Sequence, residues 1–342
     1  MARCAIVSFR LGHTDGVSVV AATWQRALTE IGFTVRTVAG AGAVDVLVPG
    51  LGIDDDIEPD RDALRAALAD VDLVVVENLL TIPMNLRASR AVADVLRGRP
   101  ALLHHHDPPW QRERYAHITE LPVDDPAWRH VTINRHTEKE MAARGIHAVT
   151  IYNGFDVDEP RAYRSAARRA IGFAPDELVV VHPVRAIPRK NVPAALALAE
   201  ALGATYWLSG PIEEDYGPEL ARVLAAARTR VLHQHHEDRA ELYAAADLVA
   251  FPSTWEGFGN PPIEAAIHRR PVVVGDYPVA AELRALGFHW FGVGDVDAIR
   301  SFLQSPDESM LDDNEALARQ HFSFAVMRDH LRALLEGAGW MP

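Results

Sequence analysis

Short runs of consecutive apolar residues alternate along the whole chain with longer stretches whose apolar residues recur at helical spacing. Short apolar runs bounded by turn signals are typical of buried strands, and amphipathic stretches are typical of helices. In the N-terminal half this pattern predicts strands at residues 4–8, 35–38, 44–48, 73–77, 101–106, 131–134 and 149–153. In the C-terminal half it predicts strands at residues 178–182, 205–209, 230–233, 248–252, 272–275 and 290–293.

Helices are predicted between these strands and at the end of the chain, among them residues 18–31, 159–170, 192–202, 239–246 and 324–336, the last stopped by Gly337. Alternating strands and helices predict an α/β fold with parallel sheets covered on both faces. The two series predict two doubly wound, Rossmann-like domains, residues 1–153 and 154–321, divided at the turn signal Asn153-Gly154. Ligands are expected at the carboxyl ends of the strands.

The composition is consistent with two cytoplasmic domains. Of the 342 residues 49% are apolar, which is enough for two cores, and Cys4 as the one cysteine excludes an internal disulfide. No apolar run has the length of a membrane helix, and the first predicted strand begins too close to Met1 for a signal peptide. The formal net charge of −13 argues against nucleic acid or an anionic membrane as a partner.

The most informative segment is residues 254–264, in which Glu256 and Glu264 flank a Gly-Phe-Gly turn and two prolines. A predicted strand precedes the segment and a helical pattern follows it. Glycines let the backbone approach a ligand, prolines suit a first helical turn, and the N–H groups of a helix start attract anions or sugar hydroxyls. The spacing of the glutamates is weak evidence alone, and the alternative is a solvated loop. The strand-turn-helix context favours a ligand site.

With these features the chain resembles the retaining glycosyltransferases of family 4, whose signature is this pair of glutamates around a Gly-Phe-Gly turn. The resemblance extends from about Ile151 to the C-terminus and is looser before it. It implies the GT-B architecture, in which two domains face an interdomain cleft and a final helix, here residues 322–342, crosses back onto the first domain. It also implies a nucleotide sugar on the second domain, an acceptor on the first, and neither a metal nor another cofactor.

A positive cluster, Arg185 and Lys190, follows the predicted strand 178–182 and lies five positions apart across a proline turn. An isolated pair of this kind is ordinarily a solvated basic turn. Arginine and lysine at a strand's carboxyl end also suit a diphosphate. The resemblance implies that both hold the donor's phosphates, whereas Arg189 has no counterpart in the family pattern and is expected in solvent.

The resemblance assigns the remaining donor contacts residue by residue. Glu264 would accept hydrogen bonds from the ribose hydroxyls, and Glu256 would lie near the transferred sugar. The backbone of the turn would hold sugar hydroxyls through Gly257, Phe258, Gly259 and Asn260.

The segment His104-His105-His106-Asp107 lies at the end of the predicted strand 101–106. Side chains alternate along a strand, so His104 and His106 share a face. A zinc site would need further ligands, and few acidic groups stand nearby in the sequence, so histidines without a metal are expected. The resemblance matches His106 and Asp107 to a position where a histidine lies beside the transferred sugar.

Three further residues are candidates for the acceptor. Gly16 stands in the loop after the first strand, which lacks a Gly-x-Gly-x-x-Gly fingerprint and so argues against a nicotinamide dinucleotide. Glu77 and Asn78 follow the strand 73–77 and suit a hydroxylated ligand, and the alternative is a plain turn before a helix cap at Asn85. Residues 1–152 carry 16 basic and 20 acidic side chains, which argues against docking on anionic lipid.

The sequence therefore predicts a retaining, metal-independent hexosyltransferase that uses a UDP- or GDP-sugar and a small hydroxylated acceptor. Its predicted catalytic residues are His106, Arg185, Lys190 and Glu256. The alternatives are a sugar-nucleotide epimerase, a phosphorylase of the glycogen type, and a non-catalytic protein that binds sugar nucleotides. An epimerase needs acid and base residues that we do not find. A phosphorylase needs a lysine for pyridoxal phosphate, whereas this chain has few lysines and Lys190 is already assigned to the donor. A non-catalytic relative would be expected to lose part of the glutamate and cation set, which is complete here.

Overall fold

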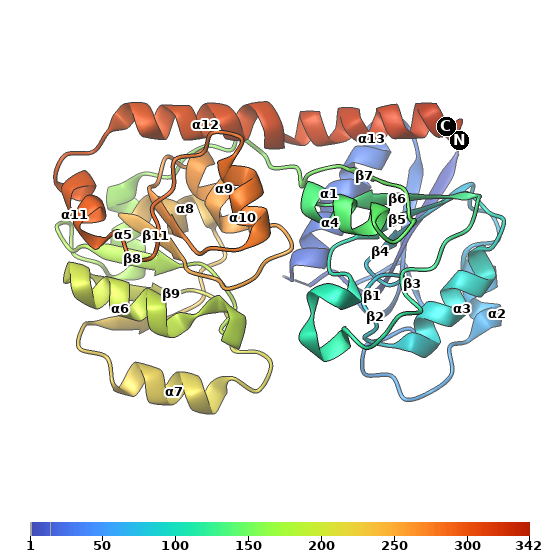
Figure 1. Cartoon of the computed structure of the whole chain (residues 1–342), viewed down its shortest axis with the longest axis horizontal. Helices are drawn as coiled ribbons and strands as arrows, with labels where there is room; N and C mark the ends of the chain where they lie inside the picture. The colour runs from blue at the N-terminus through green and yellow to red at the C-terminus, as the bar shows by residue number, and fades with distance from the viewer. Residues whose placement is uncertain (1, 14) are drawn as a thin grey trace. The chain divides into compact units, whose positions relative to one another are not determined.

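The computed structural model describes residues 2–13 and 15–342, and the chain divides into two compact units (Figure 1). Unit 1 comprises Met1–Gly154 and Phe324–Pro342, and unit 2 comprises Phe155–Ser323. The chain thus leaves unit 1 at the Asn153-Gly154 turn and returns to it for the last helix.

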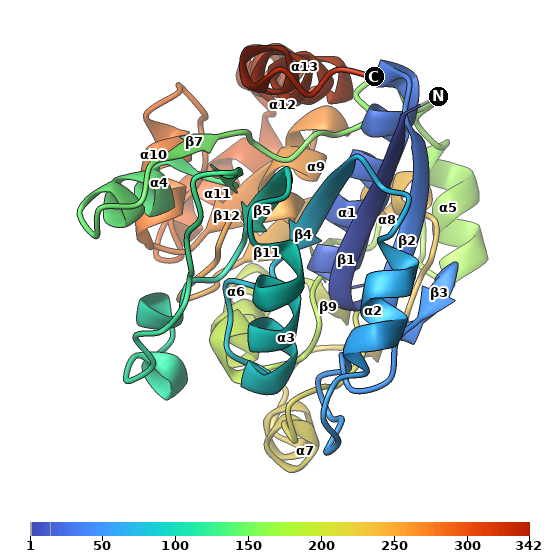
Figure 2. The same ribbon diagram turned by 90° about the vertical axis from the view of Figure 1, so that its right-hand side faces the viewer.

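Unit 1 is built on a parallel sheet that has seven strands among the described residues, in the order β3-β2-β1-β4-β5-β6-β7. The strands are β1 (Arg3–Leu11), β2 (Thr34–Gly42), β3 (Val46–Leu47), β4 (Leu73–Glu77), β5 (Ala101–His105), β6 (Trp128–Thr132) and β7 (Ala148–Thr150). The helices are α1 (Gly16–Ile31), α2 (Arg61–Ala67), α3 (Leu86–Leu96), α4 (Arg135–Ala142) and α13 (Phe324–Ala338), with 3₁₀ turns η1 (Pro109–Gln111) and η2 (Glu113–Tyr115). Figure 2 shows α2 and α3 covering one face of this sheet.

Alternate residues of the central strand β1 serve two cores, because side chains in a strand point to opposite faces. Ala5 and Val7 pack with α2 and α3, whereas Cys4 and Ile6 pack with α1 and α13. Cys4 is fully buried, and burial raises the pKa of its thiol. Helix α13 is tied to α1 by an ion pair of 2.9 Å between Arg328 and Glu30.

Unit 2 has a parallel sheet with five strands in the order β10-β9-β8-β11-β12 in this fully described part of the chain. The strands are β8 (Val179–His182), β9 (Thr205–Leu208), β10 (Val231–His233), β11 (Leu248–Phe251) and β12 (Val272–Val274). The helices are α5 (Arg164–Ile171), α6 (Val192–Leu202), α7 (Gly217–Ala225), α8 (Arg239–Ala245), α9 (Asn260–Ile267), α10 (Pro278–Arg284), α11 (Val296–Gln304) and α12 (Glu308–Phe322), with a 3₁₀ turn η3 (Pro188–Lys190). Both units are therefore α/β with parallel sheets, as predicted.

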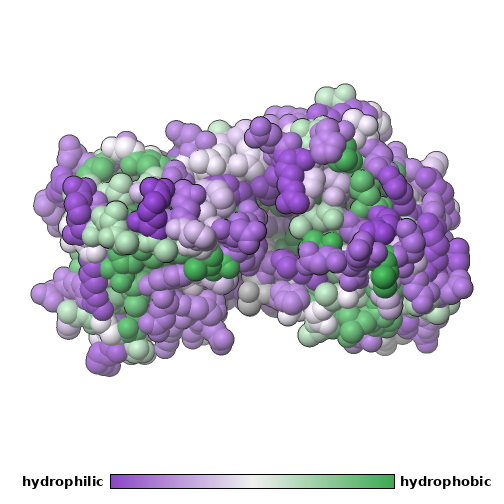
Figure 3. All heavy atoms as spheres, turned by 90° about the horizontal axis from the view of Figure 1, so that it is seen from below, coloured by the Kyte–Doolittle hydropathy of each residue, from purple (hydrophilic) through white to green (hydrophobic). Residues whose placement is uncertain are grey.

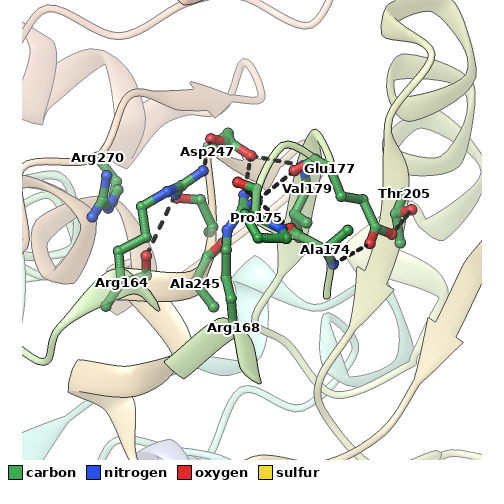
Figure 4. Close-up of polar contacts among 12 residues, drawn as sticks. Arg164, Arg168, Ala174, Pro175, Glu177, Val179, Thr205, Ala245, Asp247 and Arg270 are labelled. Carbon is green, nitrogen blue, oxygen red and sulfur yellow. Dashed lines mark hydrogen bonds and ion pairs between the residues drawn. The ribbon is translucent and has the colours of Figure 1, made fainter. Parts of the chain in front are cut away.

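A buried arginine organises the amino-terminal edge of the unit 2 sheet (Figure 4). Arg168 of α5 is 2% exposed and donates to the carbonyls of Ala174, Pro175, Glu177 and Ala245. It also donates to the Asp247 carboxylate at 2.6 Å, and that carboxylate accepts from the backbone N–H of Val179. The network joins α5 to the starts of β8 and β11.

Several predicted elements have other bounds in the structure, for example the strand predicted at 131–134, which is β6 at Trp128–Thr132, and three further differences are informative. Residues 290–293 form an isolated bridge between Phe291 and Val273 rather than a strand, because the N–H group and the carbonyl of Gly292 both bond to Asp295 in a turn. Helix α13 continues through Gly337 and ends before Gly339, whose φ of +71° suits a helix stop. The helix predicted at 159–170 begins only at Arg164.

The surface is mainly hydrophilic, with apolar atoms gathered in patches (Figure 3). Exposed large apolar side chains come from distant parts of the chain, for example Leu47 and Ile57 in unit 1 and Tyr163 in unit 2. Among residues 2–13 and 15–342, no helix combines the length and the apolar character that crossing a membrane requires.

Candidate functional site

The segment with the two glutamates lies at the carboxyl end of β11 and leads into α9, as predicted. Gly259 has a φ of +95°, and a Cβ atom there would lie 2.7 Å from the Tyr277 hydroxyl, so the turn requires glycine. The Phe258 ring is 3% exposed and packs against the rings of Phe155 and Phe322 at 6.2 and 5.6 Å. The Phe258 side chain therefore anchors the turn, and Phe258 would meet a ligand through its backbone.

Glu256 is buried and receives hydrogen bonds from two cations. Its Oε1 atom accepts from Lys190 Nζ at 2.5 Å, and its Oε2 atom accepts from a guanidinium nitrogen of Arg189. Burial by itself would raise the pKa of Glu256, but the charges of Lys190 and Arg189 hold it at about 2. Glu256 is thus an anion locked between two cations, which makes it a weak base.

Lys190 is 8% exposed, which is unusual for a lysine. Burial lowers its pKa to about 8, even though the Glu256 charge acts in the opposite direction. The ammonium group is therefore mostly protonated at neutral pH but poorly hydrated. A negatively charged ligand would gain more from such a cation than from a solvated one.

The structure pairs Arg189, and not Arg185, with Glu256. The expectation that Arg189 is solvated was wrong, since its guanidinium also donates to the Trp255 carbonyl at 3.1 Å. Arg185 donates to Glu213 at 2.5 Å and lies close enough to Lys190 to influence its pKa. The three cations gather after β8, where the 3₁₀ turn η3 brings Arg189 and Lys190 back toward β11. Arg189 is adjacent to Lys190 in the sequence, and this was the available signal that Arg189 belongs to the site.

Glu264, the second glutamate, lies on α9 with two partners of its own. Its Oε2 atom accepts from the Tyr243 hydroxyl at 2.6 Å, and its Oε1 atom accepts from Arg239 at 2.9 Å. Each carboxylate oxygen has a second lone pair, so these contacts leave acceptor capacity for a ligand. The side chain is 14% exposed.

In unit 1 the predicted residues Glu77, His104 and His106 form one buried cluster at the ends of β4 and β5. Glu77 Oε2 lies 2.9 Å from His104 Nδ1 and 2.9 Å from His106 Nε2. Glu77 and His104 are fully buried, and His106 is 5% exposed. Burial would raise the pKa of Glu77, yet the two imidazoles hold it at about 2. His104 and His106 share a face, as the alternation predicted.

Asn78 holds the neighbouring backbone. It adopts a φ of +57°, and its Oδ1 atom accepts from the N–H groups of His106 and Asp107 at 3.1 and 3.2 Å. The Asp107 carboxylate in turn pairs with Arg112. Glu77 and Asn78 were predicted to contact an acceptor, but in this structure their side chains contact the His106-Asp107 turn.

Gly16 begins α1 after Asp15, whose carboxylate caps the helix by accepting from the N–H groups of Val17 and Ser18. A Cβ atom at Gly16 would meet no atom within 4 Å among the described residues, so packing does not require glycine there. Thr14, which belongs to the same predicted loop, lies outside the described residues. The acceptor role of Gly16 remains a prediction.

Glu77, His104 and His106 have a donor set that could hold a metal ion, because one ligand atom from each lies within 4.8 Å of the others. The expectation that acidic groups are scarce near these histidines was wrong. However, a metal on His104 Nδ1 would place the proton on Nε2, which is buried without a hydrogen-bond partner among the described residues. Metal-bound histidines normally donate that proton to an acceptor. The geometry therefore favours a hydrogen-bonded cluster.

Comparisons with known proteins agree with this picture. A family profile described as "Glycosyl transferases group 1" matches residues 185–302, which include the cation cluster and both glutamates. Mannosylglucosylglycerate synthase of Thermotoga maritima is 25% identical over 90% of this chain and 89% of its own length. D-inositol 3-phosphate glycosyltransferase of Mycobacterium tuberculosis is 38% identical over 38% of this chain and 30% of its own length.

Solved structures resemble the whole chain. Anabaena Alr3699/HepE in complex with UDP and glucose has a TM-score of 0.78 at 19% identity, covering 98% of this chain and 100% of its own. Sucrose-phosphate synthase from Thermosynechococcus elongatus has a TM-score of 0.77 at 14% identity, covering 98% of this chain and 99% of its own. These likenesses show the GT-B fold, and the profile and sequence relatives support a glycosyltransferase.

Proposed function

We propose that this chain is a retaining glycosyltransferase of family 4 that transfers a hexosyl unit from a UDP- or GDP-sugar to a hydroxyl group of a small acceptor. The observation that carries the proposal is the arrangement of Lys190, Arg189 and Glu256 beside the Gly-Phe-Gly turn. A buried lysine and a partly buried arginine held by one carboxylate, with Arg185 close by, suit a diphosphate leaving group.

The donor would bind to unit 2 at the carboxyl edge of its sheet. Arg185 and Lys190 would hold the phosphates, and Glu264 would accept from the ribose hydroxyls. Glu256 would face the sugar, and the turn Gly257, Phe258, Gly259 and Asn260 would hold its hydroxyls through backbone groups. Three cations in this region supply the charge that a divalent metal supplies elsewhere, so the proposed reaction is metal-independent.

The proposed transfer retains the anomeric configuration. Glu256 has a pKa of about 2 and is bonded to two cations, so it is a poor base for the acceptor hydroxyl and a poor nucleophile. The departing diphosphate is then the better base, which requires the acceptor to approach from the face that the diphosphate leaves. The transition state has oxocarbenium character, which His106 would help to accommodate from unit 1.

The proposed acceptor is a small, polyhydroxylated molecule. The acidic balance of residues 1–152 argues against an anionic lipid, with 16 basic and 20 acidic side chains. The relatives include a mannosylglucosylglycerate synthase and a D-inositol 3-phosphate glycosyltransferase, and both names suggest compact polyols. Gly16, His106 and Asp107 are the proposed acceptor contacts, with Glu77 and Asn78 behind them.

The proposal is tested by incubating the protein with UDP- and GDP-hexoses and a panel of glycerate, cyclitol and sugar acceptors. Acceptor-dependent release of nucleoside diphosphate is expected, and it should persist in EDTA. Proton NMR of the product should show the anomeric configuration of the donor. Epimerisation without release, or nucleotide binding without turnover across the panel, would favour the epimerase or the non-catalytic alternative.

A further inference from the structure

The hydrogen-bond directions in the Glu77 cluster are determined by chemistry. An ionised carboxylate only accepts hydrogen bonds. Glu77 is such a carboxylate, and its oxygens lie 2.9 Å from His104 Nδ1 and from His106 Nε2. Both imidazole nitrogens must therefore carry protons and donate to Glu77.

These directions assign the tautomer of each ring. His104 carries its proton on Nδ1, so its Nε2 atom is a lone pair, buried and without a partner among the described residues. A buried lone pair without a hydrogen bond costs less free energy than a buried N–H group without one. The His104 ring also stacks on the Trp24 ring, with the ring centroids 4.0 Å apart. Burial lowers the pKa of His104, which keeps this ring neutral.

His106 donates through Nε2, which leaves Nδ1 as the ring nitrogen that can accept a hydrogen bond when the ring carries one proton. The backbone of His106 is held separately, because its N–H group donates to Asn78 Oδ1 at 3.1 Å. Ring and backbone are thus fixed by different partners, Glu77 and Asn78. The cluster presents His106 Nδ1 as a hydrogen-bond acceptor in a defined direction.

We propose that Glu77 is a positioning residue that holds His106 in the Nε2–H tautomer, so that His106 Nδ1 accepts a hydrogen bond from a hydroxyl group of a bound substrate. This inference rests on the proposed function, which makes His106 a substrate contact. Glu77 itself is fully buried and acts through His106. A carboxylate that orients a catalytic histidine and selects its tautomer is an established arrangement in other enzymes.

The decisive variant is Glu77→Gln. A glutamine oxygen in the place of Oε2 could accept from both rings, but the amide group would then take the place of Oε1, which lies 3.1 Å from His104 Nδ1. Two N–H donors would face each other there, so one ring must change tautomer or lose its bond. Glu77→Gln should lower kcat for transfer about 10- to 100-fold, the range seen when the partner that orients a metal-bound histidine is removed. The KM for the donor should change little, because the nucleotide contacts lie in unit 2.

A second change separates positioning from packing. In Glu77→Gln with His104→Phe, the phenyl ring can still stack on Trp24, and the glutamine oxygen has one donor left, His106 Nε2–H. The double variant should regain part of the activity lost in Glu77→Gln. A structural role predicts the reverse, since the double variant alters more of the core. Glu113→Gln, an exposed change in the same unit, is the matched control and should behave as wild type.

Nitrogen NMR of isotopically labelled histidine gives a readout that needs no turnover, with the His106 signals identified from a His106→Gln sample. The wild type should show the Nε2–H tautomer at His106, and Glu77→Gln should not. A wild-type His106 protonated on Nδ1 alone, or unchanged transfer by Glu77→Gln, would overturn the inference. If the wild type transferred no sugar at all, the proposed function would fail while the tautomer could still be read.

Discussion

Lys190 Nζ lies 2.5 Å from Glu256 Oε1, and both side chains are nearly inaccessible to solvent. The pair is internally neutralised while no ligand is bound. On the proposed function, a diphosphate at this edge of unit 2 would draw the ammonium group toward itself, and Glu256 would gain capacity to accept from a sugar hydroxyl. Donor binding and the preparation of Glu256 would then be coupled through one hydrogen bond.

Replacing Lys190 by methionine should lower kcat by about 10²- to 10³-fold, the scale for losing one preorganised charge that stabilises a leaving group. Lys139→Met is the matched control, because Lys139 is exposed on α4. Steady-state release of nucleoside diphosphate measures the turnover of both variants. A Lys190→Met protein with an unchanged thermal midpoint and near-normal turnover would remove Lys190 from the donor site.

Arg189 should matter almost as much, although the sequence pattern assigned it no role. Arg189→Gln removes the cation from Glu256 Oε2, and a hydrogen bond between charged groups is worth about 1.5–3 kcal/mol. Transfer should therefore fall by about 10- to 100-fold. Arg228→Gln breaks a comparable ion pair, of 2.7 Å with Glu200, away from the site and serves as the control. Equal activity of the two variants would contradict a role for Arg189.

The contrast between Arg185 and Arg189 illustrates what the sequence could predict. The basic turn after β8 was predictable from residue types and from the carboxyl-end rule for parallel sheets. The choice of partner was not, because Arg185 precedes the 3₁₀ turn η3 and only the tertiary fold decides which of the cations meets Glu256. Likewise, alternation placed His104 and His106 on one face, but their contact with Glu77 depends on the register in which Glu77 pairs with His104 between β4 and β5.

Strand and helix boundaries show the same limit. The helix at Val192–Leu202 was predicted to the residue, because a proline start and a glycine stop bracket it. The C-terminal helix instead passes Gly337, since a glycine stops a helix only where the backbone turns left-handed, which happens at Gly339. The sequence pattern alone does not tell which of two nearby glycines ends the helix.

The lowered pKa of Lys190, about 8, predicts a proton linkage for the donor. Negative charge from a bound diphosphate raises the pKa of the ammonium group, so binding takes up protons near pH 8 and weakens as the pH rises beyond it. Calorimetry with UDP or GDP at pH 8, in two buffers of different ionisation enthalpy, should detect the uptake. Lys190→Met should abolish it. Affinity that is constant between pH 7.5 and 9 would contradict this assignment.

Buried histidines in unit 2 predict a loss of stability in mild acid. Burial lowers the pKa of His182 to about 3 and that of His268 to about 4, whereas both would titrate near 6.5 when unfolded. The unfolded chain therefore binds more protons below pH 6.5, and stability falls from there toward pH 4. Each histidine should account for about 2 kcal/mol between pH 7 and pH 5.

Thermal midpoints at pH 7 and pH 5 test this expectation. His268→Phe is the informative variant, because the phenyl ring can keep the stacking of His268 on Tyr243, whose ring centroids lie 5.0 Å apart. Its midpoint should depend less on pH than that of the wild type. An equal drop in both proteins would show that His268 does not contribute to the acid sensitivity.

Glu264 provides the test of the nucleotide end of the donor. Its oxygens already accept from Tyr243 at 2.6 Å and Arg239 at 2.9 Å, which orient the carboxylate on α9. Glu264→Gln should weaken binding of UDP or GDP by about 1.5–3 kcal/mol if both ribose hydroxyls donate to this carboxylate. Tyr243→Phe keeps the carboxylate and removes one orienting bond, so it should weaken binding less. Calorimetry of the two variants in parallel gives the comparison. A dissociation constant unchanged by Glu264→Gln would move Glu264 out of the donor site and leave it as the buried partner of Arg239 and Tyr243.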